Sequence, residues 1–408
     1  MNRRWSLLLP VIFVTYSLAY LDRANFSFGA AAGMAKDLGI GSSQSAWIGA
    51  LFFLGYFLFQ IPGAAYAQTR SIKKLIFAGL IGWGVLATAM GVISDVRLLY
   101  VARFLLGVVE SAVLPAMLIL QARWFTRTER ARANALLVMG NPFTVAWMSF
   151  VSGYIAQKLG WRMMFVVEGL PPIIWAFVWW RLVADRPSQA SWFKPEDRAT
   201  LEAQLAAEQG GIAPVRNYAA AFRDPKVIWL SAQYFLWSLG IYGFVIWLPS
   251  MLKTVNMSLT VLGMLASVTY LVALVVEFGN ALLSDRAGRR RVFIWPSLAV
   301  GALAFYGSYL IGGQHFWISF ALLVVAGAAM YAPYGPFFAY IAEALPSNVA
   351  GGAIALINSF GALGGFVGVY FVGYLNGATG SSGASYVMMA AALLASAAIT
   401  FFLPEKRA

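Results

Sequence analysis

Long apolar runs separated by short polar connections repeat along the whole chain. A helix needs roughly 20 mostly apolar residues to cross the hydrocarbon core of a bilayer, and each run is about that long. Continuous runs do not fit the alternating pattern of membrane barrel strands, so the sequence predicts an all-α integral membrane protein. Twelve transmembrane helices are expected, at residues 6–30, 45–67, 75–93, 98–121, 133–156, 163–183, 226–250, 260–283, 291–312, 316–340, 349–375 and 384–403.

Composition supports the same class. Of the 408 residues, 61% are apolar and 11% are charged, whereas soluble domains average about 45–50% and about 25%. Too few polar residues exist to cover a soluble protein of this size, which excludes a soluble enzyme, a nucleic-acid reader and a disordered scaffold. The chain has no cysteine and one histidine, His315, which we expect in a solvated connection. Disulfides and thiolate metal sites are therefore excluded, and no metal site is expected.

Lysine and arginine indicate the orientation in the membrane. Of the 29 Lys and Arg residues, 22 fall in connections on the same side as both termini and 5 fall on the other side. Cytoplasmic loops are enriched in these residues, so both termini are expected in the cytoplasm. The same sorting accounts for the net charge of +13, and no nucleic-acid partner is inferred. The first apolar run lacks a small-residue cleavage site and is interpreted as a span rather than a signal peptide.

One long polar stretch divides the chain into two similar halves. We predict an N-terminal six-helix bundle over residues 1–184, a cytoplasmic linker over 185–225 and a C-terminal six-helix bundle over 226–408. The linker contains a short amphipathic helix from Pro195 to Glu208. The connections after the second and eighth spans also align at an offset of 217 residues, which pairs Lys74 with Arg291. Repeated six-helix halves with a substrate site between them are typical of one large class of transporters.

Specific motifs then resemble a known family. The connection SDRAGRRR, from Ser284 to Arg291, resembles the loop signature of the major facilitator superfamily. Other segments resemble its anion:cation symporter family, which carries organic anions, and a narrower resemblance is to bacterial 2-ketogluconate permeases. In the first half, Gln68 and Thr69 replace the usual Asp-Arg pair of the gate motif. The matching segments are YLDRANFS, RFLLGVVESAVLP, WRMMFVVEG, YGFVIWLP, MYAPYGPFFA and AGGAIALINSFGALGGF.

Polar residues of the first span follow one helical stripe. Tyr16, Tyr20 and Arg23 lie at spacings of four and three residues, and Asp22 lies on an adjacent strip. A guanidinium binds carboxylates through two parallel hydrogen bonds, and tyrosine hydroxyls bind sugar hydroxyls. We therefore predict that these three residues contact a hydroxylated carboxylate. The alternative is that Arg23 only pairs with Asp22 or Glu110 and locks helices together.

The fourth span carries two further charges inside the membrane. Arg103 and Glu110 lie on one face, about 10 Å apart along the axis at 1.5 Å per residue. A carboxyl group away from water holds a proton more strongly than in water unless a cation compensates. Glu110 is the first candidate for proton coupling, and the family resemblance supports Asp22 as the second. A static ion pair of Glu110 with Arg23 or Arg103 is the alternative, and Arg103 is interpreted as structural.

Uncharged polar residues in other spans complete the predicted substrate site. Each of them also fits a helix-packing hydrogen bond. The roles of Glu168 and Glu277 stay open, and an apolar slot formed by Trp237, Phe337 and Phe338 would suit an aromatic substrate. The predicted additional substrate-binding residues are Asn141, Gln233, Tyr234, Trp237, Tyr331, Tyr334, Asn358 and Ser359.

The loop after the eighth span is the candidate gate. Asp285 is expected to interact with the N-terminal end of a neighbouring helix and with Arg286 or Arg289, and Gly288 belongs to the same candidate gate. These contacts would hold the inner side closed until the halves rock.

Together these features predict a secondary transporter of the bacterial inner membrane. It would import a small sugar-acid anion, 2-ketogluconate first, by proton symport and as a monomer in the lipid bilayer. No GxxxxGK[ST] motif supports ATP drive, and no cofactor is expected. Another carboxylate, such as a hexuronate, an aldonate or an aromatic acid, or anion exchange, is the nearest alternative. A membrane-embedded enzyme or a receptor is the alternative from another class, although no catalytic motif is present and the loops are short.

Overall fold

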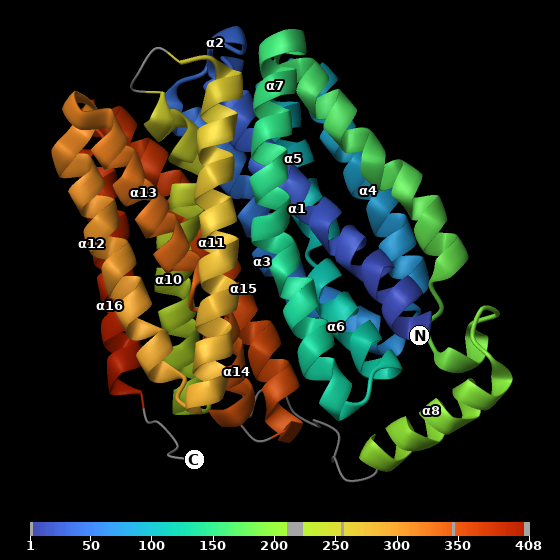
Figure 1. Cartoon of the computed structure of the whole chain (residues 1–408). Coiled ribbons are helices and arrows are strands. Elements are labelled where there is room, and N and C mark those ends of the chain that lie inside the picture. The colour runs from blue at the N-terminus through green and yellow to red at the C-terminus, as the bar shows by residue number, and fades with distance from the viewer. Residues whose placement is uncertain (1–2, 210–222, 254–256, 345–346, 404–408) are drawn as a thin grey trace.

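The computed structural model is all-helical over the residues that it describes, 3–209, 223–253, 257–344 and 347–403 (Figure 1). The first bundle holds η1 (Arg4–Leu8), α1 (Leu9–Ala31), α2 (Met34–Asp37), α3 (Ser42–Thr69), α4 (Ile72–Val92), α5 (Val96–Glu110), α6 (Val113–Trp124) and α7 (Arg127–Leu182). The linker holds η2 (Pro187–Gln189) and α8 (Pro195–Gln209). The second bundle holds α10 (Pro225–Leu252), α11 (Leu259–Ala287), η3 (Arg291–Phe293), α12 (Trp295–Ile311), η4 (Gly312–His315), α13 (Phe316–Tyr331), α14 (Tyr334–Ala344), α15 (Ser347–Thr379) and α16 (Gly383–Phe402).

The described helices account for the twelve predicted crossings. Eleven segments are long and apolar enough to cross a membrane, and one of them, residues 132–182, is 51 residues long. It contains two predicted spans, because Gly160 has a non-helical backbone with a φ of 82° inside α7. Glycine adopts this conformation without the steric penalty of a side chain, so the chain turns there. The predicted all-helical class with twelve spans is confirmed.

Two predicted spans are broken near their centres. The span predicted at 98–121 stops as α5 at Glu110 and resumes as α6 at Val113. Pro115 causes this break, because proline lacks the N–H that would bond the carbonyl of Ser111 and its ring collides with that carbonyl. Pro336 acts in the same way on the Ala332 carbonyl, and the span predicted at 316–340 is interrupted at Ala332 and Pro333, between α13 and α14.

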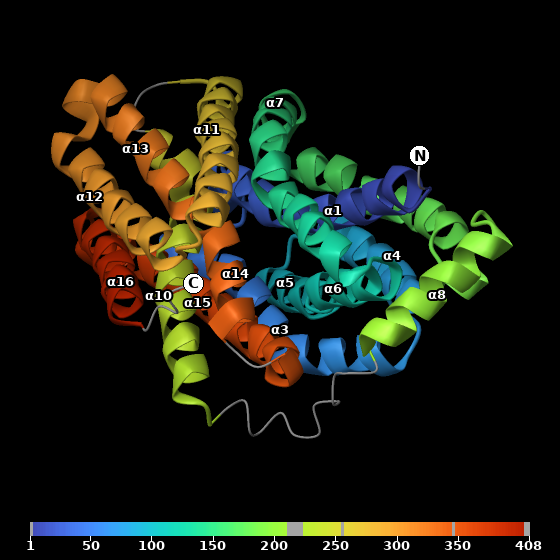
Figure 2. The same ribbon diagram turned by 60° about the horizontal axis from the view of Figure 1, so that its bottom comes forward.

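Helix α8 belongs structurally to the first bundle. It covers the segment in which the sequence predicts a helix; it lies below the first bundle in Figure 1 and in front of it, beside α4, in Figure 2. Just before it, the Trp192 indole stacks on Trp124 with ring centroids 5.2 Å apart, and Arg3 Nη1 donates to the Trp192 carbonyl. Leu201 and Leu205 of α8 are buried. The linker helix is therefore attached to one half of the molecule.

An ion pair at the same end of the molecule reinforces the first bundle. Arg4 donates to Glu129 over 2.9 Å, and Glu129 also accepts from the Thr126 backbone. Burial on its own would raise the pKa of the Glu129 carboxyl, but the hydrogen bonds from Arg4 and Thr126 outweigh it and lower that pKa. Glu129 therefore stays ionised at neutral pH, and the pairing with Arg4 is lost only as acid protonates it.

The two bundles pack tightly at the end opposite the termini. Lys253 Nζ donates to the Ala31 carbonyl over 2.8 Å, and Gln157 accepts from the Thr260 backbone over 2.9 Å. Gly153 and Gly263 let α7 and α11 approach so closely that an added Cβ at either would overlap a carbonyl oxygen of the other helix. This end, which carries α2 and the Gly160 turn, is called the closed end below.

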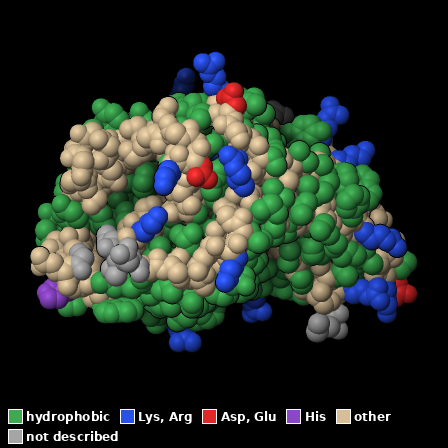
Figure 3. Space-filling model, turned by 90° about the horizontal axis from the view of Figure 1, so that it is seen from above, with side chains coloured by type: hydrophobic (Ala, Val, Ile, Leu, Met, Phe, Trp, Pro, Cys, Tyr) green, Lys and Arg blue, Asp and Glu red, His purple; other side chains and the backbone are tan. Residues whose placement is uncertain are grey.

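Apolar side chains cover the outside of both bundles. Seen from the closed end, they surround the molecule, and the single histidine lies at the rim (Figure 3). His315 is exposed, as are large apolar side chains such as Ile174, Phe177 and Leu310. Water would penalise such a surface, whereas lipid does not. The surface is that of a multi-pass membrane protein.

Close helix packing in the first bundle depends on Gly107. A Cβ at this position would overlap the Phe52 carbonyl oxygen of α3, whereas a Cβ at Gly279 would meet nothing within 4 Å. We expect Gly107→Ala to lower the free energy of unfolding by about 1–3 kcal/mol, because a packed interior yields little to an added methyl group. Unfolding in detergent micelles measures this, with Gly279→Ala as the matched control. Equal stability of the two variants would contradict the packing argument.

Candidate functional site

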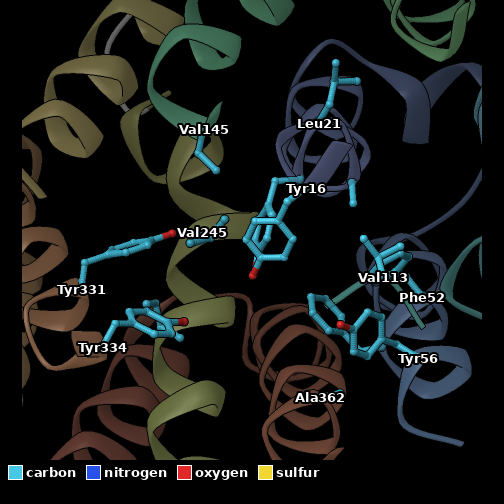
Figure 4. Close-up of a cluster of buried hydrophobic side chains, with 14 of the residues drawn as sticks. Tyr16, Leu21, Phe52, Tyr56, Val113, Val145, Val245, Tyr331, Tyr334 and Ala362 are labelled. Atoms are coloured by element: carbon cyan, nitrogen blue, oxygen red, sulfur yellow. The ribbon is translucent and has the colours of Figure 1, made fainter. Parts of the chain in front are cut away.

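A cavity of about 990 Å³, including its opening to solvent, lies between the two bundles. Its walls come from α1, α3, α6 and α7 on one side and from α10, α14 and α15 on the other. Figure 4 shows Tyr16, Tyr56 and Tyr334 pointing from different helices towards this space. Seven predicted substrate-binding residues line it: Tyr16, Tyr20, Arg23, Asn141, Tyr234, Tyr334 and Asn358.

Arg23 is the single charged side chain among the described lining residues. Its guanidinium carbon lies 4.4 Å from the ring centroid of Tyr20, 4.8 Å from that of Tyr56 and 5.1 Å from that of Phe52. Three aromatic faces stabilise a cation that is only 6% exposed. The weak hydration of a guanidinium makes this burial less costly than that of an ammonium group. The arrangement holds one fixed positive charge at the wall of the cavity.

Glu110 lies behind Arg23 and is its acidic partner. Arg23 Nη2 is 3.5 Å from Glu110 Oε2, and the glutamate side chain is fully buried. Glu110 Oε1 has no hydrogen-bond partner. The pairing is long and incomplete for a buried ion pair, which normally needs further hydrogen bonds to offset the loss of water. Arg23 is therefore not locked to Glu110 by geometry.

Arg103 and Asp22 complete a group of four buried charges. Arg103 Nη1 donates to the backbone carbonyl of Asp22 over 3.1 Å, while its Nε and Nη2 have no hydrogen-bond partner. Asp22 Oδ1 accepts from Asn25 over 3.4 Å, and Asp22 Oδ2 is unpaired. The Phe52 ring lies within 5.3 Å of both guanidinium carbons. Two cations and two acids share one region of the first bundle, so the positive and negative charges buried there offset one another.

Tyrosine hydroxyls and amides form most of the remaining polar wall. The hydroxyls of Tyr16 and Tyr20 are 3.1 Å apart. On the opposite wall, Tyr234 stacks on Phe337 with ring centroids 5.2 Å apart, which fixes the orientation of its ring. Such groups both donate and accept hydrogen bonds, as a polyhydroxylated ligand requires.

Four predicted substrate-binding residues do not line the cavity. Gln233 and Ser359 neighbour Tyr234 and Asn358, and adjacent residues on a helix point about 100° apart. Ser359 instead donates to the Ala355 carbonyl over 2.9 Å, whereas the buried Gln233 amide has no partner. Trp237 donates to the Met330 carbonyl over 2.9 Å.

Tyr331 is the fourth predicted substrate-binding residue that does not line the cavity. It packs on Tyr270, because the break at Pro333 directs Tyr331 and Tyr334 differently. The sequence also suggested an aromatic slot formed by three residues, and one of them, Phe338, lines the cavity. The other two do not: Phe337 packs on Tyr234, and Trp237 packs on Tyr334.

The cavity also contains polar residues that sequence reasoning missed. Tyr56, Tyr242 and Asn134 line it. Tyr56 and Tyr242 lie within predicted spans and Asn134 lies at the start of one, and polar residues in membrane helices tend to face the bundle interior. Asn134 precedes Asn141 by seven residues, which places both on one helix face. These two signals could have identified the three residues.

The candidate gate has a different cationic partner from the one predicted. Asp285 pairs with Arg290, which also donates to Glu343 over 2.8 Å. The expected pairs with Arg286 or Arg289 do not form among the described residues. Helix α11 ends at Ala287, and Gly288, with a φ of 61°, turns the chain so that Arg290 returns over Asp285. In the state described here, this turn gives Asp285 a partner that the sequence did not predict, and the gate role of Asp285, Arg286, Gly288 and Arg289 stays a prediction.

Two six-crossing bundles around a polar cavity in the membrane interior define a secondary membrane transporter. The sequence profile of the Major Facilitator Superfamily matches residues 12–276 and 250–408. The chain belongs to this superfamily, and it is a transporter rather than an enzyme.

Relatives extend the similarity over both bundles. A “Putative tartrate transporter” of Agrobacterium vitis is 31% identical over 404 residues, covering 97% of this chain and 89% of the relative. A “Quinolone resistance transporter” of Acinetobacter baumannii is 29% identical over 412 residues, covering 98% and 93%. A crystal structure of a bacterial homolog of the human lysosomal transporter Spinster, inward-facing and occupied, has a TM-score of 0.77 at 16% identity and covers 98% and 97%. That structure shares the fold.

Removing Arg23 would leave Glu110 buried without its cation. We expect Arg23→Met to destabilise the protein by about 3–5 kcal/mol at neutral pH, which is the usual cost of an uncompensated buried charge. Arg23→Met/Glu110→Gln should regain most of this loss because no unpaired charge remains. Denaturant unfolding in detergent micelles measures both variants, with exposed Arg286→Met as the control. Equal destabilisation of the single and double variants would argue against an energetic link between Arg23 and Glu110.

Proposed function

We propose that this protein imports a sugar-acid anion, with 2-ketogluconate as the first candidate, together with protons across the bacterial inner membrane. The observation that carries the proposal is Arg23, the one charged residue among the described lining residues, at the wall of a cavity rich in hydroxyl and amide groups. The resemblance of the sequence motifs to anion:cation symporters and 2-ketogluconate permeases supports the same assignment.

A carboxylate is the ligand group best suited to Arg23. Its guanidinium is held by aromatic faces, which leave its N–H groups available, and its bond to Glu110 is 3.5 Å long. A substrate carboxylate can make two shorter, parallel hydrogen bonds to the same group. The substrate would therefore displace Glu110 from Arg23. The relative named as a tartrate transporter supports a hydroxylated carboxylate.

The remaining polar wall suits hydroxyl groups. Six tyrosines and three asparagines line the cavity, which provides more hydrogen-bonding groups than one carboxylate could use. Removing one hydroxyl from a well-matched ligand leaves buried polar groups unpaired, so such a wall discriminates strongly. The lining residues of this kind are Tyr16, Tyr20, Tyr56, Tyr234, Tyr242, Tyr334, Asn134, Asn141 and Asn358.

Proton coupling follows from the competition for Arg23. Once the substrate occupies the guanidinium, Glu110 remains fully buried without its partner. An unpaired carboxylate in a low-dielectric interior is costly, so Glu110 takes up a proton. Release of the anion returns Arg23 to Glu110 and expels the proton. Asp22, whose Oδ2 is also unpaired, is the second candidate for this role.

Alternating access would use the asymmetry between the two ends. The bundles are joined at the closed end, while the cavity reaches Leu118, Asn134 and Ile354 towards the end that holds the termini. With both termini cytoplasmic, as the Lys and Arg distribution predicts, this is an inward-open state. Rocking of the bundles would then bring the contacts of Asp285, Arg290 and Glu343 into a closed inner gate.

An aromatic carboxylate is the second candidate substrate. Phe52, Phe53 and Phe338 add apolar surface to the cavity wall, and one relative is named as a quinolone resistance transporter. Aromatic rings pack well on such walls, while Arg23 would still hold the carboxylate. Anion exchange at the same site is the alternative to proton symport.

Transport tests the substrate and the coupling together. We expect proteoliposomes to accumulate labelled 2-ketogluconate when an inward proton gradient is imposed, and Glu110→Gln to lose the gradient-driven part. The physical reason is that glutamine can neither bind nor release the coupled proton. Glu277→Gln is the matched control, because Glu277 is a buried carboxyl of the other bundle that does not line the cavity.

Competitors distinguish the alternatives. Tartrate, glucuronate, gluconate and a hydroxyphenyl acid are added in excess during uptake. Transport of a competitor without uptake of 2-ketogluconate would discard that substrate and keep the carboxylate site. Accumulation that ignores the gradient but requires a counter-anion inside would replace symport by exchange.

If Asp285 belongs to the inner gate, replacing it should change the rate of uptake. Asp285→Asn removes one acid from Arg290, and we expect the maximal uptake rate to fall by up to about fivefold, since exposed ion pairs contribute at most on the order of 1 kcal/mol. The half-saturating substrate concentration should stay unchanged because Asp285 does not line the cavity. Glu343→Gln should not add fully to Asp285→Asn, as both share Arg290. Unaltered uptake kinetics in Asp285→Asn would count against the gate.

A further inference from the structure

A further buried acid lies outside the cavity and the ion pairs described above. Glu168 is in the second arm of α7, 3% exposed. Ser152, in the first arm of the same helix, donates to Glu168 Oε1 over 2.8 Å, and Oε2 has no hydrogen-bond partner. No ion pair with a cation is found for Glu168 among the described residues. The carboxyl group is therefore buried without charge compensation.

Asn25 connects this acid to the group of four charges. Its side chain is fully buried and lies near Glu168, and its Nδ2 donates to Asp22 Oδ1 over 3.4 Å. One amide thus lies beside both carboxyl groups and is hydrogen-bonded to one of them. Among the described residues, Asp22 is the titratable group that faces Glu168 from α1, whereas α4 presents Gly84 and Thr88 at this level.

The two acids differ in their surroundings. The backbone carbonyl of Asp22 accepts from Arg103, whereas no cation pairs with Glu168 among the residues that the structure describes. Two carboxylates on either side of one amide disfavour each other's ionised form, so their protonation is linked. The cations beside Asp22 favour its ionised form. In the state described here, Glu168 is therefore the acid that carries a proton.

Glu168 does not line the cavity and lies in the half of the membrane nearer the closed end. Near the closed end, the Trp161 indole donates to Asp37 over 2.8 Å. Glu168 follows Trp161 by seven residues, which is about 10 Å further into the membrane at 1.5 Å per residue. The acid is therefore positioned between the closed end and Asp22, where protons would enter when that end opens.

We propose that Glu168 is a second proton-holding site of the first bundle, and that Asn25 couples its charge to Asp22. Glu168 acts through Asp22 and does not touch the substrate. When the closed end opens to water, Glu168 would release its proton, and the ionised Glu168 would then favour a proton on Asp22; in this way Glu168 sets the proton concentration at which Asp22 is loaded. This inference rests on the proposed proton symport, but the presence of the proton can be tested without a substrate.

Infrared spectroscopy of the full-length protein in lipid tests the proton directly. At neutral pH we expect the C=O stretching band of protonated carboxyl groups to lose the intensity of one group in Glu168→Gln and to keep it in Glu168→Asp. Ser152→Ala should shift the frequency of that component, because the hydrogen bond to Oε1 is removed. An unchanged band in Glu168→Gln would overturn the proposal, since Glu168 would then be ionised.

The pH profile of uptake tests the coupling. With 2-ketogluconate or tartrate as the probe, we expect Glu168→Gln to need about tenfold more protons for half-maximal uptake, the equivalent of one pH unit. Glu168→Asp should restore the profile, and Ser149→Ala is the control on the same helix. In an Asn25→Leu background, or Asn25→Ala if that variant does not fold, Glu168→Gln should cause no further shift.

The outcomes separate this proposal from the proposed function. An unshifted profile in Glu168→Gln, or an equal shift with and without Asn25, would overturn the coupling. Failure of the wild-type protein to take up either probe would refute the proposed substrates, while the infrared band would still decide whether Glu168 holds a proton.

Discussion

The free energy of keeping ionisable side chains away from water constrains the whole first bundle. Two arginines and two acids are buried together, so their charges offset one another without any single ideal ion pair. Arg23 faces the cavity, whereas its partner Glu110 does not line it. Binding of an anion or a proton in this region would change that balance. Burial makes each such change energetically large, because the surroundings screen it poorly.

Helix periodicity made much of the fold and part of the site predictable. Apolar runs located the spans, and spacings of three and four residues placed Tyr16, Tyr20 and Arg23 on one helix face. In the structure all three residues line the cavity. The partner of Asp285 was unpredictable because Gly288 sets the path of the loop. Contacts such as Trp192 on Trp124 are equally invisible in sequence, since they join residues distant along the chain.

The helix breaks show a second limit of sequence reasoning. Pro115 was visible in the sequence, but prolines also occur in continuous membrane helices, as Pro249 does in α10. Only the structure shows that the break directly follows Glu110, so that this acid ends a helix. In the second bundle, Pro336 cannot bond the Ala332 carbonyl, and Asn280 donates to it over 2.7 Å instead. Side chains thus replace backbone bonds where the helix is interrupted.

The cavity walls divide their chemistry unequally between the bundles. The first bundle supplies the charged group, whereas the described lining residues of the second bundle, such as Tyr234, Phe338 and Asn358, are uncharged. Substitutions in the second wall alter shape and hydrogen bonding without altering the buried charge balance. Substitutions in the second bundle could therefore change which molecules fit the cavity while the charged group of the first bundle stays the same. An engineer who wishes to retarget this transporter would begin with the second bundle.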